Sequence, residues 1–249
     1  VLGAPLGTAL GAALDWRATL WLVTALGGLA GVVIALRLPA LRRAAAATGL
    51  RRFAPLTDGR VRTLLACTFV AFLGIYLPYT YFSAVYEPST AGSGARLAVL
   101  LFVFGAAGTV GNILAGNLAD RFGPRRVIVV VTLLLAVVLA ALPLFQGSML
   151  VAVPAAFVCG VLSFAITTPQ QQLIITYAPT AGPVITSLYQ SVLYLAISAS
   201  GAVGALVLAG WGAAPIGPVA GVLVLVAALL TGLSGRAREP RGSRYPTAT

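Results

Sequence analysis

Residues Gly111–Arg126, with the sequence GNILAGNLADRFGPRR, form a polar and basic segment between two long apolar runs. The run Leu97–Ala119 carries no charge and is long enough to cross a bilayer as a helix. A second uncharged run starts at Val127. We therefore expect a membrane helix to end in this segment, a glycine to let the backbone turn, and the arginines to hold the turn on the cytoplasmic side.

The composition of the whole chain indicates an integral membrane protein. Of its 249 residues, 59% are hydrophobic and only 8% are charged, and the mean hydropathy is +1.00. A soluble domain carries about a quarter charged residues. The net charge of +11 comes from the blocks Arg37–Arg62, Arg121–Arg126 and Arg236–Arg244, and the charges outside these blocks cancel in pairs. This clustering is the positive-inside pattern of cytoplasmic loops, so we expect no nucleic-acid partner.

The arginine blocks and the lengths of the uncharged runs set the expected topology. No charged residue occurs in residues 127–235, and both ends of that run meet arginine blocks, so the number of crossings is even. At about 20 residues per span, four crossings fit this length. The expected spans are Ala18–Leu36, Thr63–Tyr86, Leu97–Ala119, Val127–Phe145, Met149–Tyr177, Val184–Trp211 and Val219–Ser234. Val1–Leu14 is expected to be a further helix, cut at its cytoplasmic start.

Small residues share one face of that first helix. Gly3, Gly7 and Gly11 recur every four residues, and Pro5 would kink the helix between them. Such a face lets a neighbouring helix approach closely. We therefore predict a helix-packing motif at these four positions.

The Gly111–Arg126 segment also matches a family pattern. Every specified position of G-x-x-x-[DE]-[RK]-x-G-x-[RK]-[RK] is filled, by Gly116, Asp120, Arg121, Gly123, Arg125 and Arg126. In this signature loop the chain resembles the major facilitator superfamily of membrane transporters. The resemblance implies that the loop latches the cytoplasmic side, with Asp120 meeting the amino end of the Val1–Leu14 helix. Arg121 and Arg125 would offer Asp120 a charge partner.

An internal repeat agrees with this resemblance. Trp16 and Trp211 each follow a small-residue helix and precede an apolar helix that ends at Arg37 or Arg236. If residues 63–235 form one six-helix unit, an earlier unit lacks its first four helices; facilitator halves are six-helix repeats of this kind. We expect an all-α membrane protein with eight transmembrane helices: the last two of a six-helix half plus a complete C-terminal six-helix half.

The corresponding expected parts are the truncated end of the N-terminal half (1–36), a basic cytoplasmic linker (37–62), the C-terminal half (63–235) and a disordered basic cytoplasmic tail (236–249). The stretch GAPLGTALG, at residues 3–11, resembles the fifth-helix motif of facilitator-family antiporters. The chain is most similar to the twelve-helix drug and sugar efflux branch.

Polar side chains within the expected spans are candidates for a substrate cavity, and they are Tyr76, Tyr79, Gln170, Gln190 and Tyr194. The two tyrosines of the Thr63–Tyr86 span could line a cavity or form an aromatic belt at the outer interface. Gln190 and Tyr194 belong to a stripe with Ser187, Ser191 and Ser198, which we expect to point into the bundle because a lipid-facing polar stripe is costly. The stripe and Gln170 could bind substrate or join helices.

The residues argue against an enzyme. Histidine is absent from the sequence, Cys67 and Cys159 lie in apolar runs typical of packing cysteines, and no expected span contains a carboxylate. We therefore predict no catalytic residue, no metal site and no cofactor, and a membrane-embedded enzyme is disfavoured.

The resemblance implies a proton-coupled exporter of small amphipathic compounds, drugs or sugars, as in multidrug resistance, with the coupling residue in the missing helices. The alternative is a non-transporting truncated remnant. The expected partners are the lipid bilayer, a small-molecule substrate and protons, in a protein that is monomeric when complete. Arginine without lysine in an Ala/Val/Gly-rich chain suggests a GC-rich bacterium, so we expect a multi-pass protein of the bacterial inner (plasma) membrane with both termini cytoplasmic.

Overall fold

The computed structural model describes Gly7, Gly11 and residues 15–37, 56–177 and 182–236. All regular elements in these ranges are helices, which confirms the expected all-α membrane class. They are α2 (Trp16–Arg37), α3 (Gly59–Thr80), α4 (Phe82–Val85), α5 (Glu87–Thr90), α6 (Gly94–Phe122), α7 (Pro124–Ala140), the 3-10 helix η2 (Leu142–Phe145), α8 (Met149–Phe164), α9 (Thr167–Tyr177), α10 (Gly182–Trp211) and α11 (Ile216–Arg236).

Within the ranges that the structure describes, six helical segments are long and apolar enough to cross a membrane. They are Arg17–Arg37, Gly59–Thr80, Gly94–Phe122, Met149–Tyr177, Pro183–Trp211 and Ile216–Leu233. The expected span Val127–Phe145 divides into α7, with 17 residues, and η2. Seventeen residues are at the lower limit for a spanning helix. Most of the expected first helix, linker and tail lies outside the described residues.

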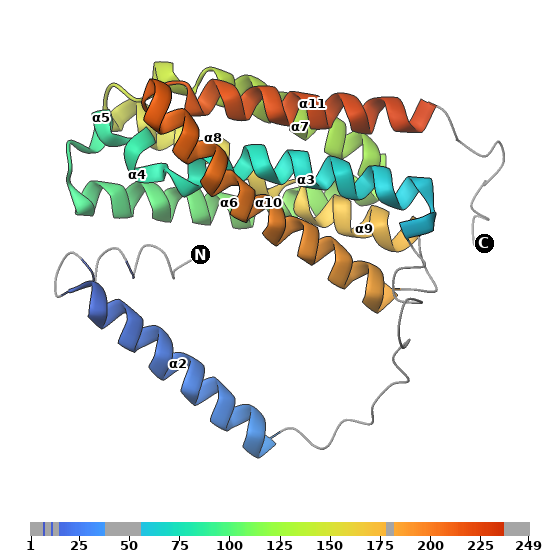
Figure 1. Cartoon of the computed structure of the whole chain (residues 1–249), viewed down its shortest axis with the longest axis horizontal. Helices are drawn as coiled ribbons and strands as arrows, with labels where there is room; N and C mark the ends of the chain where they lie inside the picture. Colours follow the sequence, from blue (N-terminus) through green and yellow to red (C-terminus); the bar gives the residue numbers. More distant parts are fainter. Residues whose placement is uncertain (1–6, 8–10, 12–14, 38–55, 178–181, 237–249) are drawn as a thin grey trace.

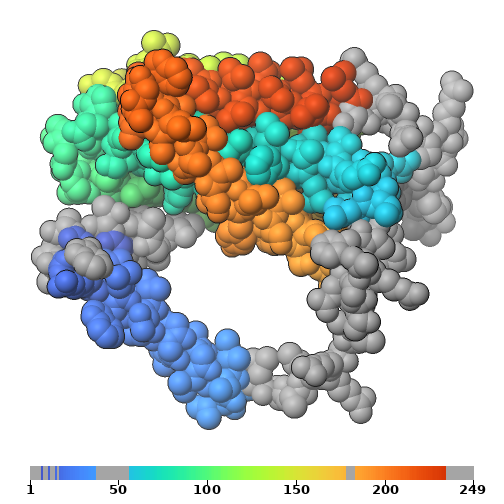
Figure 2. Space-filling view, in the orientation of Figure 1, coloured from blue at the N-terminus to red at the C-terminus, as the bar shows by residue number. Residues whose placement is uncertain are grey.

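The helices from α3 onward form one bundle, in which α3, α6 and α11 run in similar directions and α10 crosses them obliquely (Figure 1). In it, α3 packs on α10 and α11, α6 on α8, and α7 on α11. The largest fully buried side chains include Tyr189, Leu77, Leu100 and Ile166. By contrast, α2 stands beside this bundle as a separate rod (Figure 2), and none of its spanning part is buried. Its exposed apolar side chains, such as Trp21 at 73%, are suited to lipid or to further helices.

Glycines allow the closest helix pair to form. A Cβ atom on Gly111 of α6 would collide with the Val161 carbonyl of α8, and one on Gly160 of α8 would collide with the Phe104 carbonyl of α6. The two backbones therefore touch directly, as small residues permit in membrane helix pairs. This contact fixes the position of the signature loop relative to α8 and α9.

Both boundaries of α3 differ from the sequence-based expectation. α3 begins at Gly59 instead of Thr63, because the Asp58 side chain caps it by accepting a 2.7 Å hydrogen bond from the Arg60 N–H. The expected Thr63–Tyr86 span ends at Thr80, and the short helices α4 and α5 follow. The segment after it is held against the bundle, because Ser89 and Thr90 are buried and the Ser89 Oγ donates to the Gln146 carbonyl at 2.6 Å.

The Met149–Tyr177 span is interrupted between α8 and α9. Pro169 cannot donate a hydrogen bond to the Ala165 carbonyl, and its ring would clash with that group in a continuous helix. Ala165 and Ile166 therefore form a turn, which redirects the chain in the middle of the span. The residues on either side of this turn contribute to the cavity described next.

Candidate functional site

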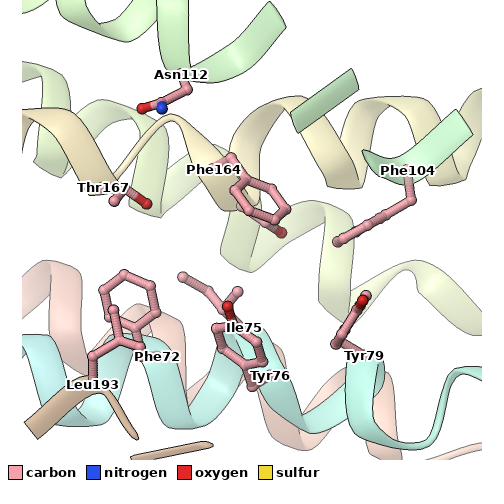
Figure 3. Close-up of a pocket in the computed structure, with 10 residues that line it drawn as sticks. Phe72, Ile75, Tyr76, Tyr79, Phe104, Asn112, Phe164, Thr167 and Leu193 are labelled. Carbon is pink, nitrogen blue, oxygen red and sulfur yellow. The ribbon is translucent and has the colours of Figure 1, made fainter. Parts of the chain in front are cut away.

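A cavity of about 330 Å³ lies between α3, α6, α10 and the α8–α9 turn (Figure 3). Figure 3 shows the α3 side chains on one side and those of α6, α8 and α9 on the other. No lining residue is charged. The lining residues are Phe72, Ile75, Tyr76, Tyr79, Phe104, Asn112, Ser163, Phe164, Thr167 and Leu193. Such a lining suits a compound that is largely apolar and carries a few polar groups.

Aromatic rings form most of the cavity wall. On α3, Phe72, Tyr76 and Tyr79 are spaced by four and three residues and therefore share one helix face. The centroid distances are 6.1 Å from Phe72 to Tyr76 and 5.7 Å from Tyr76 to Tyr79. The Tyr79 ring stacks on Phe104 of α6 at 5.4 Å, and Phe104 meets Phe164 of α8 at 5.9 Å. These rings form a continuous chain across three helices.

Polar atoms are concentrated at one end of the cavity. Asn112 of α6 accepts a hydrogen bond from the Thr168 hydroxyl of α9 through its Oδ1, so it joins two helices and also lines the cavity. Thr167 and the buried Ser163 add hydroxyl groups nearby. A bound molecule would therefore meet hydrogen-bonding groups at this end and aromatic rings elsewhere.

Gln170 joins helices and is not among the lining residues. Its side chain is only 1% exposed. Its Oε1 accepts hydrogen bonds from the Thr68 hydroxyl of α3 at 3.4 Å and from the Tyr189 hydroxyl of α10 at 3.3 Å. The sequence left open whether Gln170 binds substrate or joins helices, and the structure favours the joining of helices.

The polar stripe of α10 faces away from the other helices of the bundle. Ser187, Ser191, Tyr194 and Ser198 are exposed, Tyr194 at 65%, and Gln190 is half-buried. The expectation that this stripe points into the bundle is wrong for the described helices, because α10 packs through the opposite face, which contains Tyr189 and Ala196. The serines lower the cost of this exposure by hydrogen bonding to their own helix, as Ser191 does to the Ser187 carbonyl at 2.9 Å.

The signature loop is a tight joint between α6 and α7. Gly123 has φ +85°, a conformation that favours glycine, and its N–H closes α6 by bonding to the Ala119 carbonyl at 2.9 Å. Pro124 then occupies the first position of α7. Gly116, about two turns before Gly123, lies against Thr168, whose Cγ2 would be 3.6 Å from an added Cβ.

The charged residues of the loop point to different partners. Asp120 is exposed, and its Oδ1 accepts a hydrogen bond from the Gln172 side chain of α9 at 3.2 Å. Within the described residues no ion pair joins Asp120 to Arg121 or Arg125. The guanidinium of Arg121 lies 5.3 Å from the centroid of the Phe122 ring. The amino end of the first helix, the expected partner of Asp120, lies outside the described residues.

Arg125 performs a role that sequence reasoning missed. Its Nη2 donates to the carbonyl oxygens of Thr231 at 2.7 Å and Gly232 at 2.9 Å, near the C-terminal end of α11. The partial negative charge of that helix end favours a cation. Because Thr231 lies 106 residues away, no sequence pattern indicates this contact. Arg126, the next residue, is exposed.

Of the predicted packing motif, Gly7 and Gly11 are described, whereas Gly3 and Pro5 lie outside the described residues. The Thr19 hydroxyl of α2 donates to the Gly7 carbonyl at 3.1 Å. A Cβ on Gly7 would lie 3.2 Å from the Thr19 Cγ2. The glycines therefore do contact the following helix closely. Cys67 and Cys159 are free and buried, as expected for packing residues.

Comparisons with known proteins agree with this geometry. A family model described as Major Facilitator Superfamily matches residues 1–201. The protein called "Uncharacterized MFS-type transporter YtbD" of Bacillus subtilis (strain 168) is 24% identical over 243 residues, which cover 94% of this chain and 60% of that protein. The chain thus spans about 60% of the length of the curated relative that it matches.

Proposed function

Because this chain belongs to the major facilitator superfamily, a family of membrane transporters, we propose that the complete protein exports small amphipathic compounds, drugs or sugars, in exchange for protons. The observation that carries this proposal is the uncharged, aromatic cavity of about 330 Å³ within the helix bundle. A substrate would enter it from one side of the membrane and leave it on the other, by alternating access.

The chemistry of the cavity supports an amphipathic substrate. Tyr79, Phe104 and Phe164 offer ring faces to a planar or hydrophobic group. Asn112, Ser163 and Thr167 can hydrogen-bond a polar group at the other end. Since no lining carboxylate neutralises a cation, charged substrates would rely on the aromatic faces.

The outward-facing stripe of α10 supports the proposal that a second half of the transporter lies beside it in the complete protein. Tyr194 and its neighbouring serines form a polar surface. Contact of this surface with lipid would cost free energy, whereas the same surface is suited to line an aqueous pathway. We propose that the stripe and Tyr76 and Tyr79 belong to one substrate pathway, completed by helices of the N-terminal half.

Proton coupling would reside outside the described helices. The carboxylates that the structure describes are Asp15, Asp58, Glu87 and Asp120, and each lies at or next to the end of a helix instead of inside a span. We propose that Asp120 acts as a latch, in which the strength of its contacts in one conformation biases the equilibrium between inward-open and outward-open states. The bacterial inner membrane, with both termini cytoplasmic, is the proposed location.

Reconstitution tests this proposal. The complete reading frame would be inserted into proteoliposomes with an imposed pH gradient, and a panel of fluorescent amphipathic compounds would be assayed for accumulation. We expect at least one compound to accumulate against its gradient and to leak out when a protonophore is added. Accumulation that persists with the protonophore would contradict proton coupling, and no accumulation across the panel would contradict amphipathic export.

A further inference from the structure

A second cavity lies on the side of the bundle, next to the signature loop. It has a volume of about 320 Å³ and is a groove between the last turns of α6 and the first turns of α7. Five of its six lining residues are apolar, and the sixth is an arginine: Leu118, Phe122, Arg126, Val127, Val130 and Val131. This groove shares no lining residue with the aromatic cavity.

The groove follows from the way in which the two helices pack. α6 packs mainly on α8, whereas α7 packs mainly on α11, and only Gly123 separates the two helices at the loop. A valley remains between them. Val127 and Val131 form its buried floor, while Phe122, 50% exposed, and Val130, 54% exposed, stand at its edges.

Positive charge is present only at the loop end of this groove. Arg126 is exposed in the first turn of α7, and Val130 lies about 6 Å further along the helix axis. The Arg121 guanidinium lies over Phe122, one of the groove walls. The nearest carboxylate in sequence, Asp120, is on a different face of α6 from Leu118 and Phe122 and is hydrogen-bonded to α9.

We propose that this groove binds an anionic phospholipid, with an acyl chain along Val127, Val130 and Val131 and the phosphate on Arg126, beside Arg121. Arginines at the ends of membrane helices lie at the depth of the lipid headgroups, and basic pockets between such helices favour anionic lipids. Charge complementarity thus selects the headgroup, and the apolar valley holds the chain. The site is independent of the proposed transport activity.

Native mass spectrometry of the purified protein tests this assignment. Phosphatidylglycerol and phosphatidylcholine with identical acyl chains would be added separately, and the bound lipids counted. We expect phosphatidylglycerol to bind more tightly, and Arg126→Gln to weaken its binding about fivefold while leaving phosphatidylcholine unchanged. Arg96→Gln, which changes an exposed arginine at the opposite end of α6, is the matched control and should bind like the parent protein.

A second variant tests the groove without removing charge. Val130→Trp fills the valley from its exposed edge, and we expect it to weaken the binding of both lipids. Equal binding of the two lipids to the parent protein, or unchanged phosphatidylglycerol binding in Arg126→Gln and in Val130→Trp, would overturn the proposal. So would displacement of phosphatidylglycerol by an equal concentration of inorganic phosphate, which would indicate a site for a free anion.

Discussion

Arg125 and Thr231 lie 106 residues apart in the sequence, yet the Arg125 Nη2 donates a hydrogen bond of 2.7 Å to the Thr231 carbonyl oxygen. The contact attaches the signature loop to the C-terminal end of α11. Thr231 is itself buried, and its hydroxyl bonds to the Ala227 carbonyl at 2.8 Å. One arginine of the family pattern therefore holds two helices of the bundle together, which is a structural role in addition to any part in gating.

We expect Arg125→Gln to lower the stability of the bundle. Loss of a cation at the negative end of α11 costs about 1 kcal/mol, which corresponds to a fall of about 2–4 °C in Tm for a chain of this size. Thermal unfolding in detergent without added lipid, followed by circular dichroism, measures this change. Arg126→Gln is the control, because Arg126 is the exposed neighbour, and its Tm should not change. Equal Tm values for both variants and the parent would refute the capping role.

Gly111→Ala should destabilise the α6–α8 pair. The new Cβ would collide with the Val161 carbonyl, so the helices must separate, and overpacking of this kind costs about 1–3 kcal/mol. Gly210→Ala in α10 is the matched control, because no neighbouring atom lies within 4 Å of the added methyl group. Its Tm should stay the same or rise slightly, since alanine favours helix more than glycine does. A Gly111→Ala variant as stable as the parent would show that α6 and α8 are not in backbone contact.

Gln170→Leu should destabilise the bundle by about 1–3 kcal/mol, because the buried Tyr189 hydroxyl loses its acceptor. Thr68 keeps a partner, since its hydroxyl also bonds to the Leu64 carbonyl at 2.8 Å. Adding Tyr189→Phe to Gln170→Leu should therefore recover part of the loss, and the two substitutions should not be additive. Gln171→Leu, at the half-buried neighbour, should have a smaller effect on Tm. Additive losses in the double variant would show that the two side chains do not interact.

Tyr79→Ala should weaken the binding of any substrate found in the proteoliposome screen. Stacking of the Tyr79 ring on an aromatic group of the substrate would be worth up to about 1.5 kcal/mol, so its loss should raise the apparent KM by up to about tenfold. The control is Phe157→Ala, because Phe157 of α8 is 45% exposed and does not line the cavity. A similar rise in KM for both variants would place the substrate elsewhere.

Asp120→Asn removes the negative charge of the proposed latch but keeps the shape of the side chain. The asparagine oxygen can still accept the hydrogen bond from Gln172, so we expect an unchanged Tm. Export by the complete protein should nevertheless fall, because the negative charge is lost at the cytoplasmic joint. Glu87→Gln, at the exposed first residue of α5 at the other end of the bundle, should leave export unchanged. Full export by Asp120→Asn would remove the latch from the proposed mechanism.

Much of the fold could be predicted from local pattern. The uncharged runs predicted α2, α6, α10 and α11 to within a few residues, because hydropathy and length decide which segments can span a bilayer. The turn at Gly123 was also foreseen, since a glycine between two apolar runs permits a positive φ. The breaks at Tyr81 and at Ala165 were missed, although Pro169 in the sequence was a usable signal for the second.

The candidate site was only partly predicted. Tyr76 and Tyr79 were identified as candidate cavity residues from their helical spacing within an apolar span, and both line the cavity. Phe104, Phe164 and Leu193 were missed, because an aromatic or aliphatic residue in a membrane helix looks the same in sequence whether it faces lipid, a neighbouring helix or a cavity. The stripe containing Tyr194 was recognised, but it faces away from the described helices and not into them.

The sequence by itself determined that this protein is an α-helical membrane protein, and it identified the signature loop at Gly116–Arg126. These features depend on the free energy of transferring each segment from water to lipid and on local backbone conformation. Both are set by residues that are close together in the sequence. Only the tertiary structure decided that Gln170 joins three helices, that Arg125 caps α11, and that the α10 stripe faces outward. Those outcomes depend on which helices pack together, and packing is set by contacts between residues that are far apart in the chain.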